Sequence, residues 1–336
     1  MTKPSYSLVM FATALAFCVV ILGAFTRLQE AGLGCPDWPG CYGFAIWPRT
    51  AEQISQAELL FPDAPYEHAK AWPEVVHRYF ASTLGFVIIV INIIAWRNRR
   101  NHNQPFKLPL FLLALVIAQG MFGMWTVTLK LWPQVVTTHL LGGFATLSLL
   151  WLLALRLNQR AWPQPVYPMK WRKLRPLAMI GLILVIAQIA LGGWTSSNYA
   201  ALACPDLPTC QGRWLPPMDF ADGFNITQEI GPNYLGGQLD GSARVAIHMT
   251  HRIGAIVVTL YMIFLLSQLY RYAGGHQMRR QANVIATLLF VQVGLGLSNV
   301  IWSLPLPIAV AHNACGALLL LSLVTLNYRL TKSTSW

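Results

Sequence analysis

Charged residues are scarce in this chain. Asp, Glu, Lys and Arg make up only 11% of its 336 residues, whereas a water-soluble domain usually carries about 25%. No such residue occurs between Lys3 and Arg27, between Lys107 and Lys130, or between Lys130 and Arg156. These runs exclude an ordinary soluble protein, because about 20 consecutive apolar residues are enough for a helix to cross a bilayer.

Eight segments are long and apolar enough to span a membrane. They lie near residues 6–26, 75–96, 108–128, 135–155, 176–197, 245–269, 282–301 and 308–328. Backbone polar groups in lipid must be paired within the segment, so each span is expected to be an α-helix. The predicted fold class is an all-α integral membrane protein with eight transmembrane helices.

Acidic residues are missing from the short segments after the second, fourth and sixth spans, whose charged residues are all basic. All twelve acidic residues fall in the two long loops after the first and fifth spans, or, as Glu74, at the start of the second span. This is the positive-inside pattern, so both termini are expected in the cytoplasm and both long loops outside. The pattern also explains the net charge of +12 without a nucleic-acid partner.

The chain contains an internal repeat. Each recurring feature returns, in the same order, 169 to 174 residues later. The matched features are Gly23–Thr26 with Gly192–Thr195, Cys35 and Cys41 with Cys204 and Cys210, His77-Arg78 with His251-Arg252, Gln119 with Gln292, and His139 with His312. The repeat predicts two pseudo-symmetric four-helix bundles of the same orientation, an amino-terminal half at 1–160 and a carboxy-terminal half at 161–336.

Four histidines are expected near the outer ends of the even-numbered spans, two in each half: His77, His139, His251 and His312. Ionisable groups in membrane spans are costly and usually functional. A histidine pair on facing helices of a four-helix bundle suits the two axial positions of a haem iron. Hydrogen bonding between helices and a zinc or copper site are the alternatives, but such a metal site would need three or four converging ligands.

Other polar residues accompany these histidines. Arg78 and Arg252 directly follow a histidine and are candidates to pair with haem propionates. His248 shares a helical face with His251, so either could be a ligand, although the repeat favours His251. The first half has Glu74 at the place of His248, which predicts different work for the two haem sites.

Two cysteine pairs lie in the loops predicted to be outside, where disulfides persist. The short spacing between Cys35 and Cys41, and between Cys204 and Cys210, predicts one disulfide in each loop. We favour a structural role for these disulfides, in which each one stabilises its loop, and a redox role stays open.

The Glu-x-x-His-Arg run at 74–78, the Cys-Pro-Asp-x-Pro-x-Cys loops and the four spaced histidines resemble the haem A synthase family, from Gly23 to Gly316. That family oxidises the C8 methyl of haem O to a formyl group, which gives haem A for cytochrome oxidase. The resemblance implies that His77 and His139 hold the substrate haem O, that His251 and His312 hold a haem b cofactor, and that Glu74 is catalytic.

The resemblance leaves part of the mechanism open. Two axial histidines saturate an iron, so either one ligand leaves the substrate haem or the methyl is oxidised through electron withdrawal. In the second route Glu74 would stabilise positive charge and water would supply the oxygen. Disulfides in the outer loops and the positive-inside pattern fit a bacterial plasma membrane. The family implies contacts with haem O synthase. The electron donor and the oligomeric state, a homotrimer among the options, are not visible.

Three other functions use some of the same residues. A two-haem electron-transfer cytochrome needs the four histidines but gives Glu74 no role, and both haems would lie near one face of the membrane. A haem carrier needs binding without chemistry. A thiol–quinone oxidoreductase would use the outer cysteines and leaves the histidines unexplained.

Overall fold

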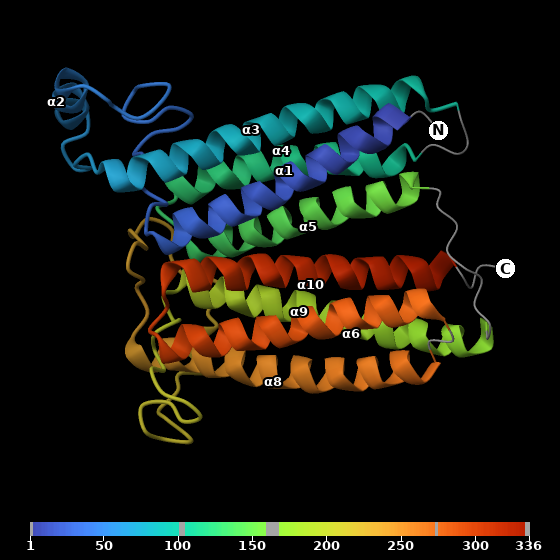
Figure 1. The fold of residues 1–336 in the computed structure, drawn as a ribbon. Helices are drawn as coiled ribbons and strands as arrows, with labels where there is room; N and C mark the ends of the chain where they lie inside the picture. The colour runs from blue at the N-terminus through green and yellow to red at the C-terminus, as the bar shows by residue number, and fades with distance from the viewer. Residues whose placement is uncertain (1–2, 101–104, 159–167, 273–274, 333–336) are drawn as a thin grey trace.

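The computed structural model describes residues 3–100, 105–158, 168–272 and 275–332 (Figure 1). Eight of the described helices are long and apolar enough to cross a membrane, which confirms the predicted all-α membrane fold. The predicted boundary at 160/161 falls outside the described residues. The eight helices are α1 (Lys3–Leu28), α3 (His68–Arg97), α4 (Lys107–Thr128), α5 (Pro133–Leu157), α6 (Pro168–Ser197), α8 (Gly241–Tyr272), α9 (His276–Ile301) and α10 (Leu306–Lys332).

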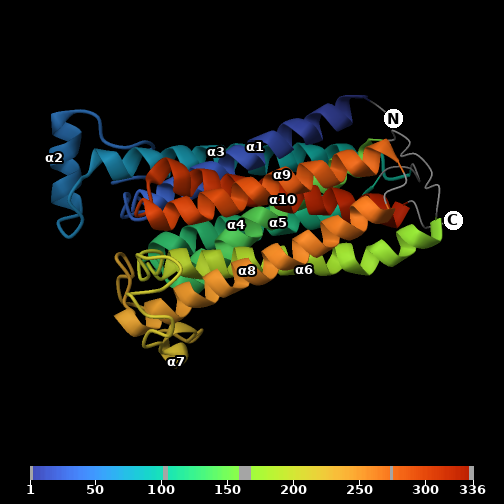
Figure 2. The ribbon, with the colours of Figure 1, turned by 60° about the horizontal axis from the view of Figure 1, so that its bottom comes forward.

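Two shorter helices lie in the long loops, and the sequence analysis missed both. Helix α2 (Ala51–Leu60) projects from the bundle in Figure 1, and α7 (Phe220–Gly223) appears beside the second long loop in Figure 2. Helix α2 begins with a capping box, in which Thr50 accepts from the Gln53 backbone and the Gln53 side chain accepts from the Thr50 backbone. The Thr-x-x-Gln spacing was the available signal for it.

The histidine-bearing helices lie diagonally opposite each other. Helices α3 and α5 each pack against α1 and α4, so the four helices form a ring with α3 and α5 on one diagonal. Helices α8 and α10 each pack against α6 and α9 in the same way. Side chains of α3 and α5, or of α8 and α10, can therefore approach each other across the centre of a bundle.

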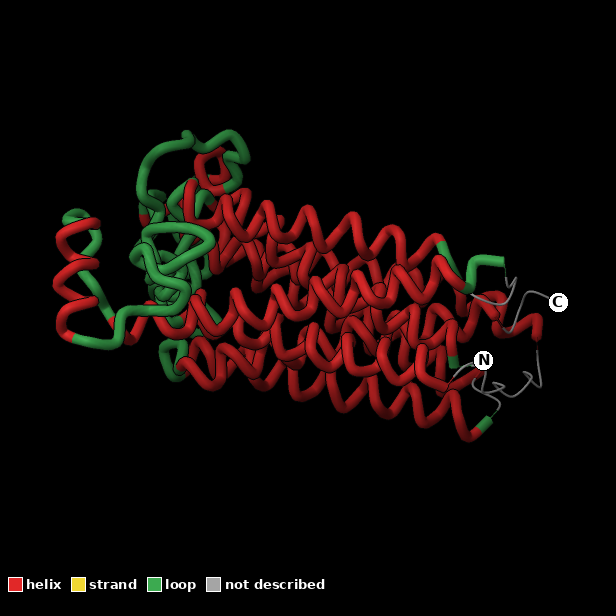
Figure 3. The backbone as a smooth tube through the Cα atoms, turned by 90° about the horizontal axis from the view of Figure 1, so that it is seen from above, coloured by secondary structure: helices red, strands yellow, loops and turns green. Residues whose placement is uncertain are grey.

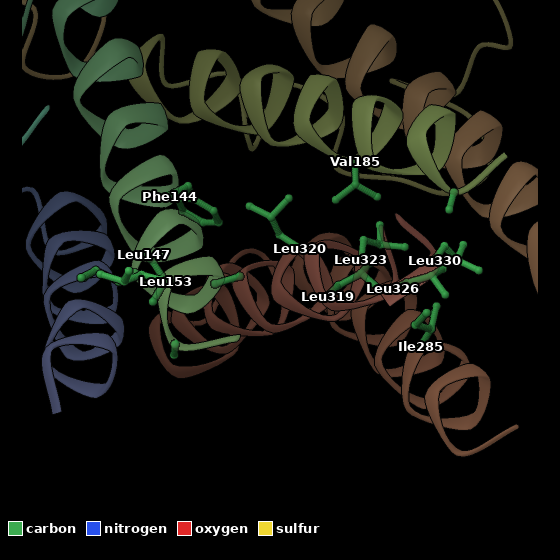
Figure 4. Packing of buried hydrophobic residues seen from close by; sticks show 14 of the residues in the cluster. Phe144, Leu147, Leu153, Val185, Ile285, Leu319, Leu320, Leu323, Leu326 and Leu330 are labelled. Carbon is green, nitrogen blue, oxygen red and sulfur yellow. The ribbon is translucent and has the colours of Figure 1, made fainter. Parts of the chain in front are cut away.

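Helices α5, α6 and α10 join the two rings of helices. Figure 4 shows Leu147 of α5, Val185 of α6 and Leu323 of α10 among the buried side chains, and Leu147 and Leu323 are fully buried. Because lipid is as apolar as leucine, such contacts stabilise helix pairs through close packing. The indole Nε1 of Trp151 adds a hydrogen bond of 2.7 Å to Oγ1 of Thr325, on α10.

Arg27 at the end of α1 also links the two rings. Its guanidinium donates to the backbone carbonyl of Ser196 at the end of α6, and it lies 4.1 Å from the ring centroid of Tyr199. Arg27 and Ser196 occupy matching places in the sequence repeat, 169 residues apart. The matching ends of α1 and α6 therefore contact each other.

The two long loops gather at one end of the helices. Figures 1 and 3 show them at the end opposite to the start of α1 and the end of α10. Both cysteine loops and the amino-terminal ends of α3 and α8 therefore lie on one side of the molecule. This side carries the candidate functional residues.

Candidate functional site

Each of the four histidines packs against a glycine on the neighbouring helix of its hairpin. A Cβ added to Gly23 would lie 3.0 Å from Cε1 of His77, which is tighter than most side-chain contacts. The corresponding distances are 3.2 Å for Gly296 with His312, 3.3 Å for Gly192 with His251 and 3.4 Å, close to ordinary van der Waals contact, for Gly123 with His139. Four glycines therefore make room for four rings.

The residue four positions before each glycine touches the same histidine. The Gln188 amide lies with Nε2 3.0 Å from Nδ1 of His251, and the Gln292 amide lies with Nε2 3.3 Å from Nε2 of His312. The backbone of Gln119 hydrogen-bonds to His139, and the backbone of Val19 to His77. The contacting atoms differ, since an amide reaches Nδ1 of His251 and Nε2 of His312, and one of the four positions holds valine in place of glutamine.

The two histidines of each four-helix bundle lie near one another. His77 interacts electrostatically with His139, and His251 with His312, across the diagonals described above. Nδ1 of His77, His139 and His312 is buried and has no hydrogen-bond partner. A buried imidazole nitrogen without a partner is costly unless something binds it, so these rings suit coordination of an iron.

No group of three or more His, Cys, Asp or Glu within the described parts of the chain could hold a metal ion. A zinc site needs three or four such ligands.

Glu74 is buried, with only 5% of its surface exposed, near the start of α3. Its Oε2 accepts a hydrogen bond of 3.0 Å from the backbone N–H of Cys35, and its Oε1 pairs with the guanidinium of Arg78 one turn along. Both oxygens thus have donors, which fixes the orientation of the carboxylate. Glu74 and His77 are three residues apart and share one face of the helix.

His248 occupies the corresponding position on α8 and is also buried. Its Nδ1 lies 3.0 Å from the backbone carbonyl oxygen of Ala200, in the loop after α6. His251, in contrast, has the glycine contact and the glutamine contact that mark the other three candidate ligands. The geometry therefore favours His251 as the ligand and gives His248 a structural contact.

The two arginines hold the cysteine loops. Nη1 of Arg252 donates to the carbonyls of Asp206 and Thr209, both at 2.9 Å, and its Nη2 to that of Cys204 at 2.7 Å. Nη1 of Arg78 donates in the same way to the carbonyls of Asp37, Pro39 and Gly40. Because the loop carbonyls occupy these donors, the pairing of Arg78 and Arg252 with haem propionates stays a prediction.

Both predicted disulfides form, Cys35–Cys41 and Cys204–Cys210. In each loop an aspartate accepts from two backbone N–H groups just after the second cysteine. Asp37 accepts from Tyr42 and Gly43, and Asp206 from Gln211 and Gly212. The loops are therefore two copies of one structure.

Gly85, Gly142, Gly143, Gly254 and Gly316 lie on the histidine-bearing helices, but they are not the glycines that pack against the imidazoles. Gly142, Gly254 and Gly316 instead lie against the amides of Gln119, Gln188 and Gln292, and Gly85 has open space around it. The glycines that touch the rings are on the partner helices, and the sequence analysis did not single out these contacts or Gln188. The shared spacing of glutamine and glycine, four apart in α4, α6 and α9, was the signal for both.

The fold and site together define a multi-pass helical membrane protein with two pairs of buried histidines. A family model described as "Cytochrome oxidase assembly protein" (COX15-CtaA) matches residues 6–324. A Shewanella oneidensis protein named "Heme A synthase" is 48% identical over 317 residues, which cover 94% of each chain. A protein of the same name from Caulobacter vibrioides is 28% identical, over 96% of this chain and 95% of its own length. Another from Mesorhizobium japonicum is 26% identical, over 94% of this chain and 87% of its own length. The chain belongs to the COX15-CtaA family of cytochrome oxidase assembly proteins.

Proposed function

We propose that the chain is a haem A synthase, an oxidoreductase that converts the C8 methyl of haem O to a formyl group. Family membership and the relatives' names support the activity. One observation supports different roles for the two halves. The buried carboxylate of Glu74 lies three residues before His77, whereas His248 stands three residues before His251.

The amino-terminal half, 1–160, binds the substrate haem O through His77 and His139. The carboxy-terminal half, 161–336, holds haem b through His251 and His312. The buried, unpartnered Nδ1 atoms of His77, His139 and His312 and the glycine at each of the four imidazoles support these assignments. When bound, haem b supplies an iron centre that can accept and pass on single electrons.

Glu74 is the catalytic residue of the substrate half. Its Oε1 is held by Arg78 and its Oε2 by the N–H of Cys35, so the carboxylate has one orientation. A carboxylate in an apolar site stabilises positive charge that develops nearby, because low dielectric strengthens electrostatic interactions. It can also accept a proton at either oxygen as the methyl is oxidised. His248 offers no carboxylate at the matching place, so the cofactor half lacks this chemistry.

The protein lies in a bacterial plasma membrane with both termini in the cytoplasm and the cysteine loops outside. The basic segments on the cytoplasmic side and the two disulfides support this orientation. The partners are the bilayer, the enzyme that makes haem O, an electron donor and further copies of this chain.

The division of labour is tested by separate measurements of binding and conversion. Glu74→Ala and His77→Ala are expected to abolish haem A formation and to retain haem b, measured by extraction and mass analysis of the haems in the purified proteins. His251→Ala is the matched variant in the other half and should lose haem b. Loss of haem b from Glu74→Ala and His77→Ala would refute the separation of the two sites.

A further inference from the structure

The four histidine niches follow one plan. In α4, α6 and α9, a glutamine precedes by four residues the glycine that touches the ring: Gln119 with Gly123, Gln188 with Gly192, and Gln292 with Gly296. In α1, Val19 occupies the position four residues before Gly23. His77 is therefore the one candidate ligand in the set whose niche has no amide side chain.

Two of the three amides, those of Gln188 and Gln292, contact a histidine. Nε2 of Gln188 lies 3.0 Å from Nδ1 of His251 and donates to the carbonyl of that same residue at 2.9 Å. Nε2 of Gln292 lies 3.3 Å from Nε2 of His312. Because an amide has both donors and an acceptor, it can hold an imidazole in either tautomer. Valine offers neither.

A glycine on the histidine-bearing helix accompanies each glutamine. A Cβ on Gly142 would lie 1.8 Å from the Gln119 amide, and one on Gly254 would lie 2.3 Å from that of Gln188. Both glycines follow their histidine by three residues, whereas Gly316, at which a Cβ would lie 3.4 Å from the Gln292 amide, follows His312 by four. The third and fourth residues after His77 are Phe80 and Ala81. A glutamine and the glycine that faces it are thus both missing beside His77.

We infer that Val19 makes His77 the exchangeable ligand, so that haem can enter and leave the amino-terminal half while the carboxy-terminal half retains its haem. This inference rests on the proposed function, in which one haem is substrate and the other is a resident cofactor. Hydrogen-bond partners of a ligating histidine fix its orientation and strengthen its bond to the metal. Both candidate ligands of the resident haem contact a glutamine amide, whereas His77 and His139 are hydrogen-bonded by the backbone of Val19 and of Gln119. Val19 is a positioning residue, since it acts through His77.

The test measures haem loss from the whole protein. Wild type and variants are purified, loaded with haem B at both sites, and mixed with excess apomyoglobin as the acceptor. The transfer is followed by absorbance. Wild type should lose haem in a fast phase from the amino-terminal half and a slow phase from the other half.

Val19→Gln should slow the fast phase about tenfold relative to Val19→Leu, which adds similar volume without an amide. The slow phase should not change. Gln188→Val is the reciprocal variant, and it should accelerate the slow phase about tenfold while the fast phase keeps its rate. A gain in haem retention cannot come from simple loss of structure, and Gln188→Val keeps the test decisive if Val19→Gln does not fold.

Two outcomes separate this inference from the proposed function. Equal fast phases for Val19→Gln and Val19→Leu, or a slow phase that Gln188→Val does not change, would overturn the role of Val19 even if the wild type makes haem A. Phases that change as described in a protein that makes no haem A would support the role of Val19 and refute the proposed activity.

Discussion

The backbone N–H of Cys35 donates a hydrogen bond of 3.0 Å to Oε2 of Glu74. The first disulfide loop therefore touches the residue proposed to be catalytic. The second loop has a different relation to its helix, because the Ala200 carbonyl there contacts His248. The two loops have one structure but do not have equal consequences for chemistry.

Removal of each disulfide should therefore have different effects. Cys35→Ser with Cys41→Ser should lower haem A formation strongly, because the loop that orients Glu74 loosens. Cys204→Ser with Cys210→Ser should reduce thermal stability more than conversion, by roughly 2–4 kcal/mol if the bridge has a typical effect. The measurement is conversion per folded, haem-loaded protein. A second-loop variant that folds and binds haem normally yet is inactive would contradict this assignment.

The role of the glycine that packs against each imidazole can be tested with two variants of one helix, α9. Gly296→Ala would place a Cβ 3.2 Å from Cε1 of His312, so the ring must move at a cost of about 1–3 kcal/mol. Haem b occupancy, measured by absorbance of the purified protein, should fall. Gly294→Ala lies two residues away with open space around it and should keep full occupancy. Equal occupancy in the two variants would mean that the close approach of Gly296 has no role in binding.

Replacement of Arg252 should loosen the second disulfide loop more than it weakens haem binding. Arg252→Gln removes donors to the carbonyls of Cys204, Asp206 and Thr209, and a hydrogen bond to a charged group contributes about 1.5–3 kcal/mol. Limited proteolysis should therefore cut the loop faster than in the wild type, whereas Arg213→Gln, exposed on the same loop, should not. A protein that loses haem but keeps a protected loop would favour the propionate role instead.

The second loop should also respond to acid. The hydroxyl of Thr209 donates to Asp206 and lowers the pKa of that carboxyl below its ordinary value of 3.8, with help from the N–H groups of Gly212 and Gln211. A lowered pKa in the folded state gives stability that is present above pH 3.8 and is lost as pH falls through the folded pKa. The difference in melting temperature between wild type and Asp206→Asn should therefore be steady near neutral pH and shrink in acid. A difference that stays constant from about pH 7 to about pH 3 would exclude this contribution.

The sequence predicted the eight spans well, because long apolar runs leave the chain few other structures in lipid. It also predicted both disulfides, because their short loops leave few ways to pair four cysteines. It missed helix α2, whose ten residues carry little hydrophobic signal and depend on the Thr50 cap.

Contacts between helices could not be predicted in the same way. The pairing of Gly23 with His77, or of Gln188 with His251, depends on how two helices cross and rotate, which a single sequence does not state. The partners of Arg78 and Arg252 were hidden for the same reason, since backbone carbonyls carry no mark in the sequence. The asymmetry between Glu74 and His248 was visible in the sequence, but the loop that holds each of them was not.

The central claim is that this chain converts haem O to haem A. The most direct measurement is mass analysis of haems extracted from cells that make haem O, with and without this chain. The account predicts haem A, or its hydroxymethyl precursor, only when the chain is present, and neither product when Glu74→Ala replaces it. Unchanged haem O in cells that contain the folded, haem-loaded protein and a working electron donor would contradict the account and favour a role in electron transfer or haem carriage.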